Sequence, residues 1–517
     1  MNLLKTLLSI SSMTMLSRIT GLARDVLINA YFGANALTDA FNTAFRIPNL
    51  LRRLFAEGAF AQAFVPILAE YKTNQGEAAT KQLIDHVSTV LCWALILTAV
   101  LGILAAPMIV WLAATGMAAR PAEFELTVIM TRIMFPYIAF MSLVALAGGI
   151  LNSWRQFKIP AFTPVLYNLV SILATLFLAP FLAKPIYALA LAVLVGGMLQ
   201  LAIQIPALIK IGMLPRLSWR VGTAWQDPGV RRIAKNMVPA VMAVSAAQIS
   251  ILINTNIASH LAVGSISWLA NADRLMEFPT ALLGVALGTI LLPGLSRATS
   301  SGDMHEYSSL LNWGLRLTFL LALPAAVALA TIPDALTATL YHHAKFDAHA
   351  VAMTARGLVA YGVGLLGLIV VKILAPAFYA RQDIRTPVKI ALIVMLSTQF
   401  MNLLFVPRFS HAGLALSVGL GACVNAALLY RGLIKRKLFQ LQAGWRFFML
   451  RLFGALCLLA GTASVLAGQV NWLGLQAQPV WRAALLGGVI TASALVYFAA
   501  LYLMGFKLRD FRKTALV

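Results

Sequence analysis

The sequence predicts an all-α polytopic membrane protein of about fourteen transmembrane helices, arranged as two six-helix lobes and two extra C-terminal helices. Hydrophobic residues make up 61% of the chain and charged residues only 11%, a balance far from that of a soluble domain. Apolar runs of roughly 20 residues, long enough to cross a bilayer, recur along nearly the whole chain. A proline pattern also repeats between the two halves.

Each expected helix is an apolar run bounded by charged residues, glycine or proline. Two of the runs are expected to be broken, and the prolines within or beside the helices each imply a kink or a helix start. Connectors of about 4 to 20 residues leave no room for a soluble catalytic domain. The expected spans lie near residues 8 to 32, 37 to 70 (broken), 84 to 114, 124 to 151, 160 to 181, 186 to 209, 232 to 260, 265 to 296 (broken), 309 to 332, 351 to 379, 387 to 406, 412 to 433, 446 to 468 and 482 to 505.

The internal repeat has an offset of 227 residues. Pro66 corresponds to Pro293, and Pro160 corresponds to Pro387, so the proline interval is 94 residues in both halves. About six helices fit into one offset, and an even number of spans keeps the two halves in the same orientation, as in transporters with parallel repeats. The last two helices fall outside the repeat.

The repeat predicts an N-lobe at residues 1–225 with the first six helices and a C-lobe at 226–440 with the next six. Residues 441–517 add the last two helices and a basic C-terminus. Most of the 40 lysines and arginines fall in the inner connectors and the termini, which predicts cytoplasmic termini by the positive-inside rule. The net charge of +23 is therefore a signal of topology and does not indicate a nucleic-acid partner. The outer connectors hold only Arg120, Lys184, Lys345, Arg408 and Arg482.

Three helices carry polar stripes at helical spacing, which suits helices that line a wet cavity. An arginine that faces hydrocarbon costs roughly 2.5 to 3.5 kcal/mol, so intramembrane arginines are expected to face the protein interior. The stripe on the first helix is Ser11, Thr14, Arg18, Asp25 and Asn29. The stripe on the second is Asp39, Asn42, Arg46, Asn49 and Arg53. The third is Ser267, Asn271, Arg274 and Glu277.

Guanidinium groups grip phosphate through paired donors, so several arginines in one cavity favour a polyanionic cargo such as a diphosphate. The alternative is that these arginines snorkel or form structural ion pairs, and it applies best to Arg52 and Arg53 near the inner helix end. Arg24 lies about 120° from Arg18 on an ideal helix. It reaches the same cavity only if Gly21 loosens the helix or the cavity is wide.

The segment from Arg46 to Gly58 contains a proline and a glycine near the arginines, and it is expected to act as a hinge or gate through Pro48, Gly58 and the neighbouring Gly21. His342, His343, Asp347 and His349 cluster in an outer loop, but their spacing matches no helical zinc pattern. A solvated loop is the preferred interpretation, and neither a metal nor a cofactor is expected. No nucleotide-binding loop, metalloprotease motif or nucleophile elbow occurs in the sequence, which argues against an enzyme or an ATP-driven pump.

Long stretches of the sequence resemble the MurJ (MviN) family of bacterial lipid II flippases, from Met1 to the basic C-terminus. The resemblance is carried by Ser11-Ser12-Met13-Thr14-Met15 through Arg18, Gly21, Arg24 and Asp25, by the runs Pro48 to Phe60 and Ala272 to Pro279, and by Gly284 to Pro293. It implies a member of the multidrug/oligosaccharidyl-lipid/polysaccharide (MOP) exporter superfamily with a cationic central cavity. It also implies that the last two helices form a groove for a lipid tail.

The resemblance implies a function in cell-wall synthesis and cell shape. Such proteins carry undecaprenyl-diphosphate-linked peptidoglycan precursor, lipid II, across the bacterial cytoplasmic (inner) membrane by alternating access. The energy source is an ion gradient or the membrane potential. Membrane lipids and other cell-wall synthesis proteins are the further partners implied. Together with the stripes, the expected substrate-binding residues are Arg18, Arg24, Asp39, Arg46, Asn49, Arg52, Arg53, Ser267, Arg274 and Glu277.

Two departures from the family pattern bear on this expectation. Position 46 is Arg where relatives carry Lys, which keeps the charge and changes the donor geometry. Some relatives bind sodium through an Asp in the seventh helix, but residues 232 to 260 contain no Asp or Glu, so the coupling ion stays open. The alternative functions are a multidrug or cation antiporter of the same superfamily and a membrane enzyme that acts on the same lipid. An antiporter for cations needs carboxylates where arginines dominate here, and an enzyme needs a general base at the outer surface.

Overall fold

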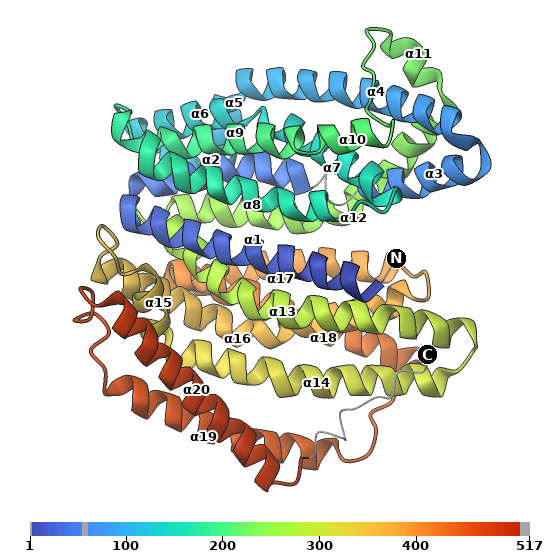
Figure 1. Ribbon diagram of the computed structural model, residues 1–517. Helices are drawn as coiled ribbons and strands as arrows, with labels where there is room; N and C mark the ends of the chain where they lie inside the picture. The colour runs from blue at the N-terminus through green and yellow to red at the C-terminus, as the bar shows by residue number, and fades with distance from the viewer. Residues whose placement is uncertain (1–2, 54–59, 507–517) are drawn as a thin grey trace. The chain divides into compact units, whose positions relative to one another are not determined.

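The computed structural model describes residues 3–53 and 60–506, and every regular element in these two ranges is a helix (Figure 1). The chain forms two compact units, Met1–Ile266 and Ser267–Val517. The first unit contains α1 (Leu3–Phe32), α2 (Ala36–Arg52), α3 (Phe60–Asn74), α4 (Gly76–Leu104), α5 (Ala106–Ala113), η2 (Thr115–Ala119), α6 (Pro121–Met134), α7 (Tyr137–Ser153), α8 (Lys158–Leu173), η3 (Ala174–Leu178), η4 (Ala179–Phe181), α9 (Tyr187–Ala202), α10 (Ile205–Lys210), α11 (Val221–Gln226) and α12 (Pro228–Ser259).

The second unit is built mainly from long helices that follow α12. Its last two helices, α19 and α20, pack side by side (Figure 1). The elements are α13 (Ser265–Ser300), α14 (Met304–Thr331), α15 (Pro333–Tyr341), α16 (Ala348–Tyr379), α17 (Arg385–Phe409), α18 (His411–Lys435), α19 (Trp445–Gly468) and α20 (Pro479–Leu503).

The all-helical membrane fold is confirmed, because ten helical spans among the described residues are long and apolar enough to cross a bilayer. Their outward side chains are apolar as well, for example Leu97 at 60% exposed and Leu403 at 74% exposed, as expected for a surface that faces lipid. The helices that carry the polar stripes, α1, α2 and α13, are not among these ten, and neither is α12. The count of fourteen spans stays a prediction.

The corner between α1 and α2 separates the end of the first polar stripe from the start of the second. Gly33 has φ 75°, a left-handed conformation that glycine adopts without steric cost, and its N–H donates to Asn29 O at 2.8 Å. Asn35 then caps α2 through its side chain, while the Thr38 hydroxyl accepts from the Asn35 N–H. This capping box fixes the start of α2 and places Asp39 in its first turn, where a carboxylate suits the helix dipole.

The predicted repeat is visible in the backbone. Arg155 and Gln382, 227 residues apart, both have φ 59°. In each half the next residue closes the same turn: Gln156 N–H donates to Leu151 O at 2.8 Å, and Asp383 N–H donates to Phe378 O at 3.0 Å. Each turn leads into a helix, α8 or α17, that carries its proline at the third position. The same local structure therefore recurs in both units at the offset read from the sequence.

Two features bear on the expected lobes. α12, which the sequence places in the C-lobe, packs against α3 and η2 of the first unit. α19 and α20 lie outside the repeat and join the second unit through a small core with α14, in which the Tyr497 hydroxyl donates to Leu320 O at 2.6 Å. The lobe boundaries at 225/226 and 440/441 stay predictions.

Candidate functional site

The predicted site residues fall into two groups, one in each unit. Arg18 to Arg53 belong to α1 and α2 of the first unit, whereas Ser267, Arg274 and Glu277 belong to α13 of the second. Each group places polar and charged side chains on helices of a unit whose residues are mostly apolar.

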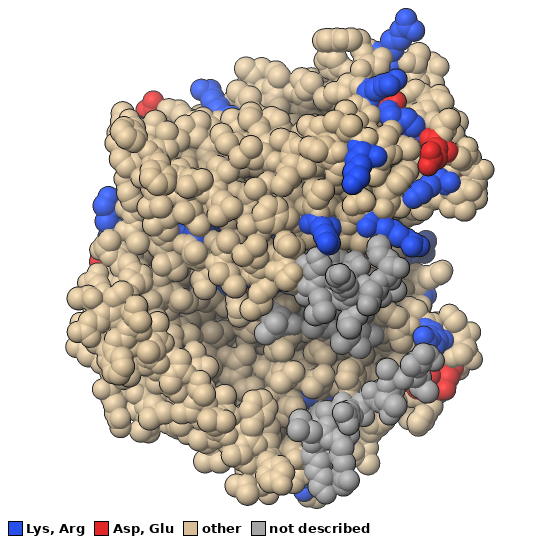
Figure 2. All heavy atoms as spheres, viewed as in Figure 1, with Lys and Arg blue, Asp and Glu red and all other residues tan. Residues whose placement is uncertain are grey.

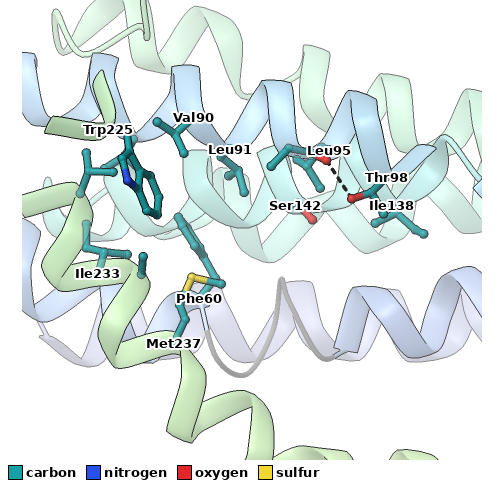
Figure 3. Close-up of a pocket in the computed structure, with 14 residues that line it drawn as sticks. Phe60, Val90, Leu91, Leu95, Thr98, Ile138, Ser142, Trp225, Ile233 and Met237 are labelled. Atoms are coloured by element: carbon teal, nitrogen blue, oxygen red, sulfur yellow. Dashed lines mark hydrogen bonds between the residues drawn. The ribbon is translucent and has the colours of Figure 1, made fainter. Parts of the chain in front are cut away.

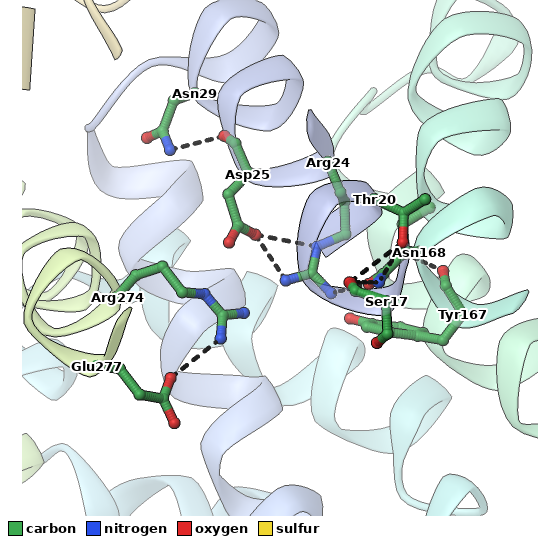
Figure 4. Close-up of polar contacts among 10 residues, drawn as sticks. Ser17, Thr20, Arg24, Asp25, Asn29, Tyr167, Asn168, Arg274 and Glu277 are labelled. Atoms are coloured by element: carbon green, nitrogen blue, oxygen red, sulfur yellow. Dashed lines mark hydrogen bonds and ion pairs between the residues drawn. The ribbon is translucent and has the colours of Figure 1, made fainter. Parts of the chain in front are cut away.

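Arg24 is the most firmly held of the predicted cations (Figure 4). It is only 8% exposed, and its Nε and Nη2 donate to Asp25 Oδ1 at 3.0 and 2.6 Å. Nη1 donates to Asn168 Oδ1 at 2.9 Å, and the guanidinium carbon lies 5.0 Å from the centre of the Tyr167 ring. Arg24 therefore points toward α8. This settles the direction of its side chain, which the sequence left open.

Arg18 differs from Arg24, because it is exposed on the same helix. α1 continues through Gly21 without a break. Asn168 of α8 packs there, with its Nδ2 donating to Ser17 O at 3.0 Å and lying 3.1 Å from Thr20 Oγ1. The two arginines lie on different sides of α1, one fixed against α8 and one exposed.

On α2, Asp39 and Arg46 join the helix to the α12 region of the same unit. Asp39 is 2% exposed, and its Oδ2 accepts from the Gly264 N–H at 2.6 Å. About two turns further along, Arg46 Nη1 donates to the hydroxyl of Thr255 at 2.7 Å. The N-terminal part of the α2 stripe is thus built into the first unit.

The C-terminal end of α2 is more exposed. Arg52 Nε donates to Asn49 Oδ1 at 2.9 Å, which lays the Arg52 side chain along its own helix. Arg53 is exposed at the C-terminal end of α2. α2 runs on through the buried Pro48, and the predicted hinge residue Gly58 lies outside the described residues.

The α13 stripe divides along its length. Ser267 and Asn271 are buried, at 2% and 8% exposed. Arg274 and Glu277 have side chains 47% and 50% exposed, and Arg274 Nη1 lies 3.3 Å from Glu277 Oε2 (Figure 4). An exposed pair of this kind is worth about 0 to 1 kcal/mol, so the guanidinium can exchange this partner at little cost.

Electrostatically, α1 and α2 are cationic. Arg18, Arg24, Arg46 and Arg52 share these two helices with the carboxylates Asp25 and Asp39. Fixed guanidinium groups inside a membrane protein provide donors for an anionic group without the reorganisation that water requires. The arrangement suits the binding of a phosphate-bearing cargo.

Sequence reasoning missed the partners that position these arginines. Asn168 and Tyr167 hold Arg24, and Thr255 holds Arg46. Asn168 did leave a signal, since an amide in the middle of an apolar span is costly unless it finds partners.

The histidines that the sequence places in an outer loop lie beside a buried arginine. Among the described residues no group of three or more His, Cys, Asp or Glu could hold a metal ion. Instead Arg482, which the sequence assigns to a connector, is fully buried in α20. Its Nη2 donates to His342 O at 3.0 Å and lies 3.4 Å from His343 Nε2. Burial first, and then the charge of Arg482, lower the pKa of both histidines.

The helical spans and the arginine-bearing helices define a multi-span membrane transporter. A family model described as lipid II flippase MurJ matches residues 28–476. The chain is 56% identical to the lipid II flippase MurJ of Burkholderia cenocepacia, with 100% of both chains covered. It is 38% identical to the probable lipid II flippase MurJ of Vibrio cholerae, over 99% of this chain and 98% of the relative. The chain belongs to the lipid II flippase MurJ family.

Two solved structures share the fold. A lipid II flippase MurJ in an inward closed conformation aligns with a TM-score of 0.81 at 24% identity, covering 97% of this chain and 99% of that one. An inward-facing multidrug resistance MATE family transporter of the MOP superfamily aligns with a TM-score of 0.70 at 12% identity, covering 83% and 97%. These two likenesses confirm the all-helical membrane fold that the sequence predicts.

Proposed function

We propose that this protein carries lipid II, the undecaprenyl-diphosphate-linked peptidoglycan precursor, from the inner to the outer face of the bacterial cytoplasmic membrane. The observation that carries the proposal is the concentration of arginines on α1, α2 and α13 in a member of this family. A diphosphate presents several acceptor oxygens, and guanidinium groups match them with paired donors.

The proposed roles follow from how tightly each side chain is held. Arg18 and Arg274 are the cations proposed to meet the diphosphate, because Arg18 is exposed and the ion pair between Arg274 and Glu277 is half exposed. Arg24 and Arg46 are held by neighbouring helices, so the positions of their guanidinium groups are fixed. The remaining residues proposed to line the site are Asp39, Asn49, Arg52, Arg53, Ser267 and Glu277.

Transport by alternating access is part of the proposal, with 1–225 and 226–440 as the moving lobes and Gly21, Pro48 and Gly58 as hinge or gate positions. The parallel repeat supports it, since transporters that work by alternating access are often built from two repeats of similar structure. Cysteines placed beside Arg18 and Arg274 should react with impermeant reagents from both sides of the membrane. Labelling from one side alone, in all conditions, would contradict alternating access.

The membrane arrangement proposed is multi-pass, with both termini cytoplasmic and 441–517 forming the groove for the lipid tail. The excess of Lys and Arg in the inner connectors supports the orientation. An ion gradient or the membrane potential drives the step, and other cell-wall synthesis proteins act before and after it. Reporter fusions at both termini should be active only in the cytoplasm; an active periplasmic reporter at either end would overturn the topology.

The experiment that tests the function is depletion of the protein in its host. Precursor should then accumulate at the inner face, with little at the outer face, and plasmid-borne wild type should restore the outer pool. Arg18→Ala should fail to restore it at normal protein abundance, whereas alanine at the lipid-facing Leu97 should restore it fully. An outer pool unchanged by depletion would refute the function.

A further inference from the structure

The first unit contains an apolar cavity separate from the arginine stripes (Figure 3). Its volume is about 230 Å³, and it lies among α4, α7, α11, α12 and Phe60 of α3. All of its lining side chains are apolar except Thr98 and Ser142, and the Thr98 hydroxyl donates to Ala94 O at 2.8 Å. The volume is below the roughly 300 to 1,000 Å³ of pockets for drug-sized ligands, which suits a narrow hydrocarbon chain.

The length of the cavity matches one leaflet of a bilayer. On α4 the lining runs from Val87 to Thr98, a rise of about 16 Å along an α-helix. The hydrocarbon core of a bilayer is roughly 30 Å thick, so one leaflet is about 15 Å deep. α4 is itself one of the apolar spans. The cavity therefore extends about as far as a single acyl chain does.

One end of the cavity lies at a segment with the composition of a membrane interface. Trp225 of α11 lines the cavity and is 46% exposed, and Trp219 is 84% exposed. Trp219 packs on Trp93 of α4 with ring centres 4.8 Å apart, which holds the segment against the span. Tryptophan is enriched at the level of lipid headgroups, so this end of the cavity is expected at headgroup depth.

The same end is surrounded by exposed cations, and Lys and Arg are seen in the region of α11 in Figure 2. Arg216, Arg220 and Arg231 are exposed, and Arg231 Nε donates to Trp225 O at 3.1 Å. The nearby Asp227 is already engaged by His86 at 2.8 Å and by the Gly229 N–H. Basic side chains beside a membrane surface attract anionic lipids.

We propose that this cavity binds one acyl chain of an anionic glycerophospholipid, whose phosphate lies against Arg220 and Arg231. The lipid comes from the leaflet on the α11 side of the membrane. An undecaprenyl chain is several times longer than the cavity, so the cargo is a poor fit. The bound lipid fills the space between α4 and α12 and fixes α11 at the interface.

The test is retention of lipid by the purified full-length protein, measured by native mass spectrometry with phosphatidylglycerol, phosphatidylethanolamine and a polyprenyl diphosphate as separate probes. Wild type should retain phosphatidylglycerol most strongly. Ala234→Trp fills the cavity and should lower retention by about ten-fold or more, equivalent to 1.4 kcal/mol. Leu97→Trp, which places the same indole side chain on the lipid-facing side of α4, should retain as much as wild type.

The headgroup is tested by Arg220→Ala with Arg231→Ala, which should remove the preference for phosphatidylglycerol over phosphatidylethanolamine; Arg385→Ala in the second unit is the matched control. Equal retention by Ala234→Trp and Leu97→Trp would overturn the proposal, as would retention of polyprenyl diphosphate in place of phospholipid.

A second readout does not depend on a substitution. Phosphatidylglycerol with a diazirine at the end of one chain should cross-link to the peptides of Thr98 and Ile138. Cross-links confined to the outward face of α4, at Leu97 and Leu101, would overturn the proposal. None of these readouts measures transport, so a failure of the lipid-binding proposal can be told apart from a failure of the proposed function.

Discussion

Replacing Asn168 with alanine tests whether Arg24 is held by α8 in the way the structure indicates. The change removes the acceptor of Arg24 Nη1 at 2.9 Å in a buried position. A hydrogen bond to a charged group contributes about 1.5 to 3 kcal/mol. Because Asn168 also donates to Ser17 O, the single substitution should cost more than this, and only a double-mutant cycle with Arg24→Ala isolates the bond.

The assay is equilibrium unfolding of the purified protein in mixed micelles, carried out on wild type, the two single variants and the double variant. The coupling free energy between positions 24 and 168 should be about 1.5 to 3 kcal/mol. Asn152→Ala, an exposed amide on α7, is the control and should be neutral within about 0.5 kcal/mol. Additive effects at positions 24 and 168 would refute the contact.

Three further predictions concern other parts of the protein. Arg274→Ala should abolish complementation while the free energy of unfolding changes by about 1 kcal/mol or less, because the ion pair with Glu277 is half exposed; growth at the wild-type rate would remove Arg274 from the site. Arg46→Lys should keep transport within about three-fold, since the charge remains, and loss of complementation would show that the bond geometry matters. His342 and His343 have pKa values lowered by burial and by Arg482. As the pH falls, the unfolded chain therefore binds protons at these histidines at a higher pH than the folded protein does. The melting temperature should be highest above pH 6.5 and should fall as the pH drops through that value. His343→Gln should reduce this pH dependence, and a melting temperature that does not change from pH 8 to 5 would contradict the contact.

Much of the fold could be predicted because membrane insertion imposes simple rules on sequence. Apolar length gave the spans, and prolines at equal intervals gave the repeat, because a duplicated segment keeps the spacing of its prolines. The turns at Arg155 and Gln382 follow from that duplication. The packing of α12 on α3 could not be predicted, because it depends on the shapes of the two helices and not on the hydropathy of α12.

The site could be predicted at the level of residue type and only in part at the level of geometry. Intramembrane arginines are costly enough to stand out. Their partners are not visible in sequence, because Asn168 lies 144 positions from Arg24 and the contact exists only once α1 and α8 pack. The environment of His342 and His343, which the sequence assigns to a solvated loop, could not be predicted for a related reason. Arg482 at a helix start looks solvated in sequence, yet the α15 end buries it.

The most direct test of the central claim is translocation by the purified protein in vesicles loaded with a lipid-linked diphosphate precursor. Exposure of the precursor at the opposite leaflet would be followed with an impermeant enzyme, with and without an imposed membrane potential. Wild type should move the precursor faster than protein-free vesicles, and Arg18→Ala and Arg274→Ala should not. Rates equal to those of protein-free vesicles under both conditions would contradict the account.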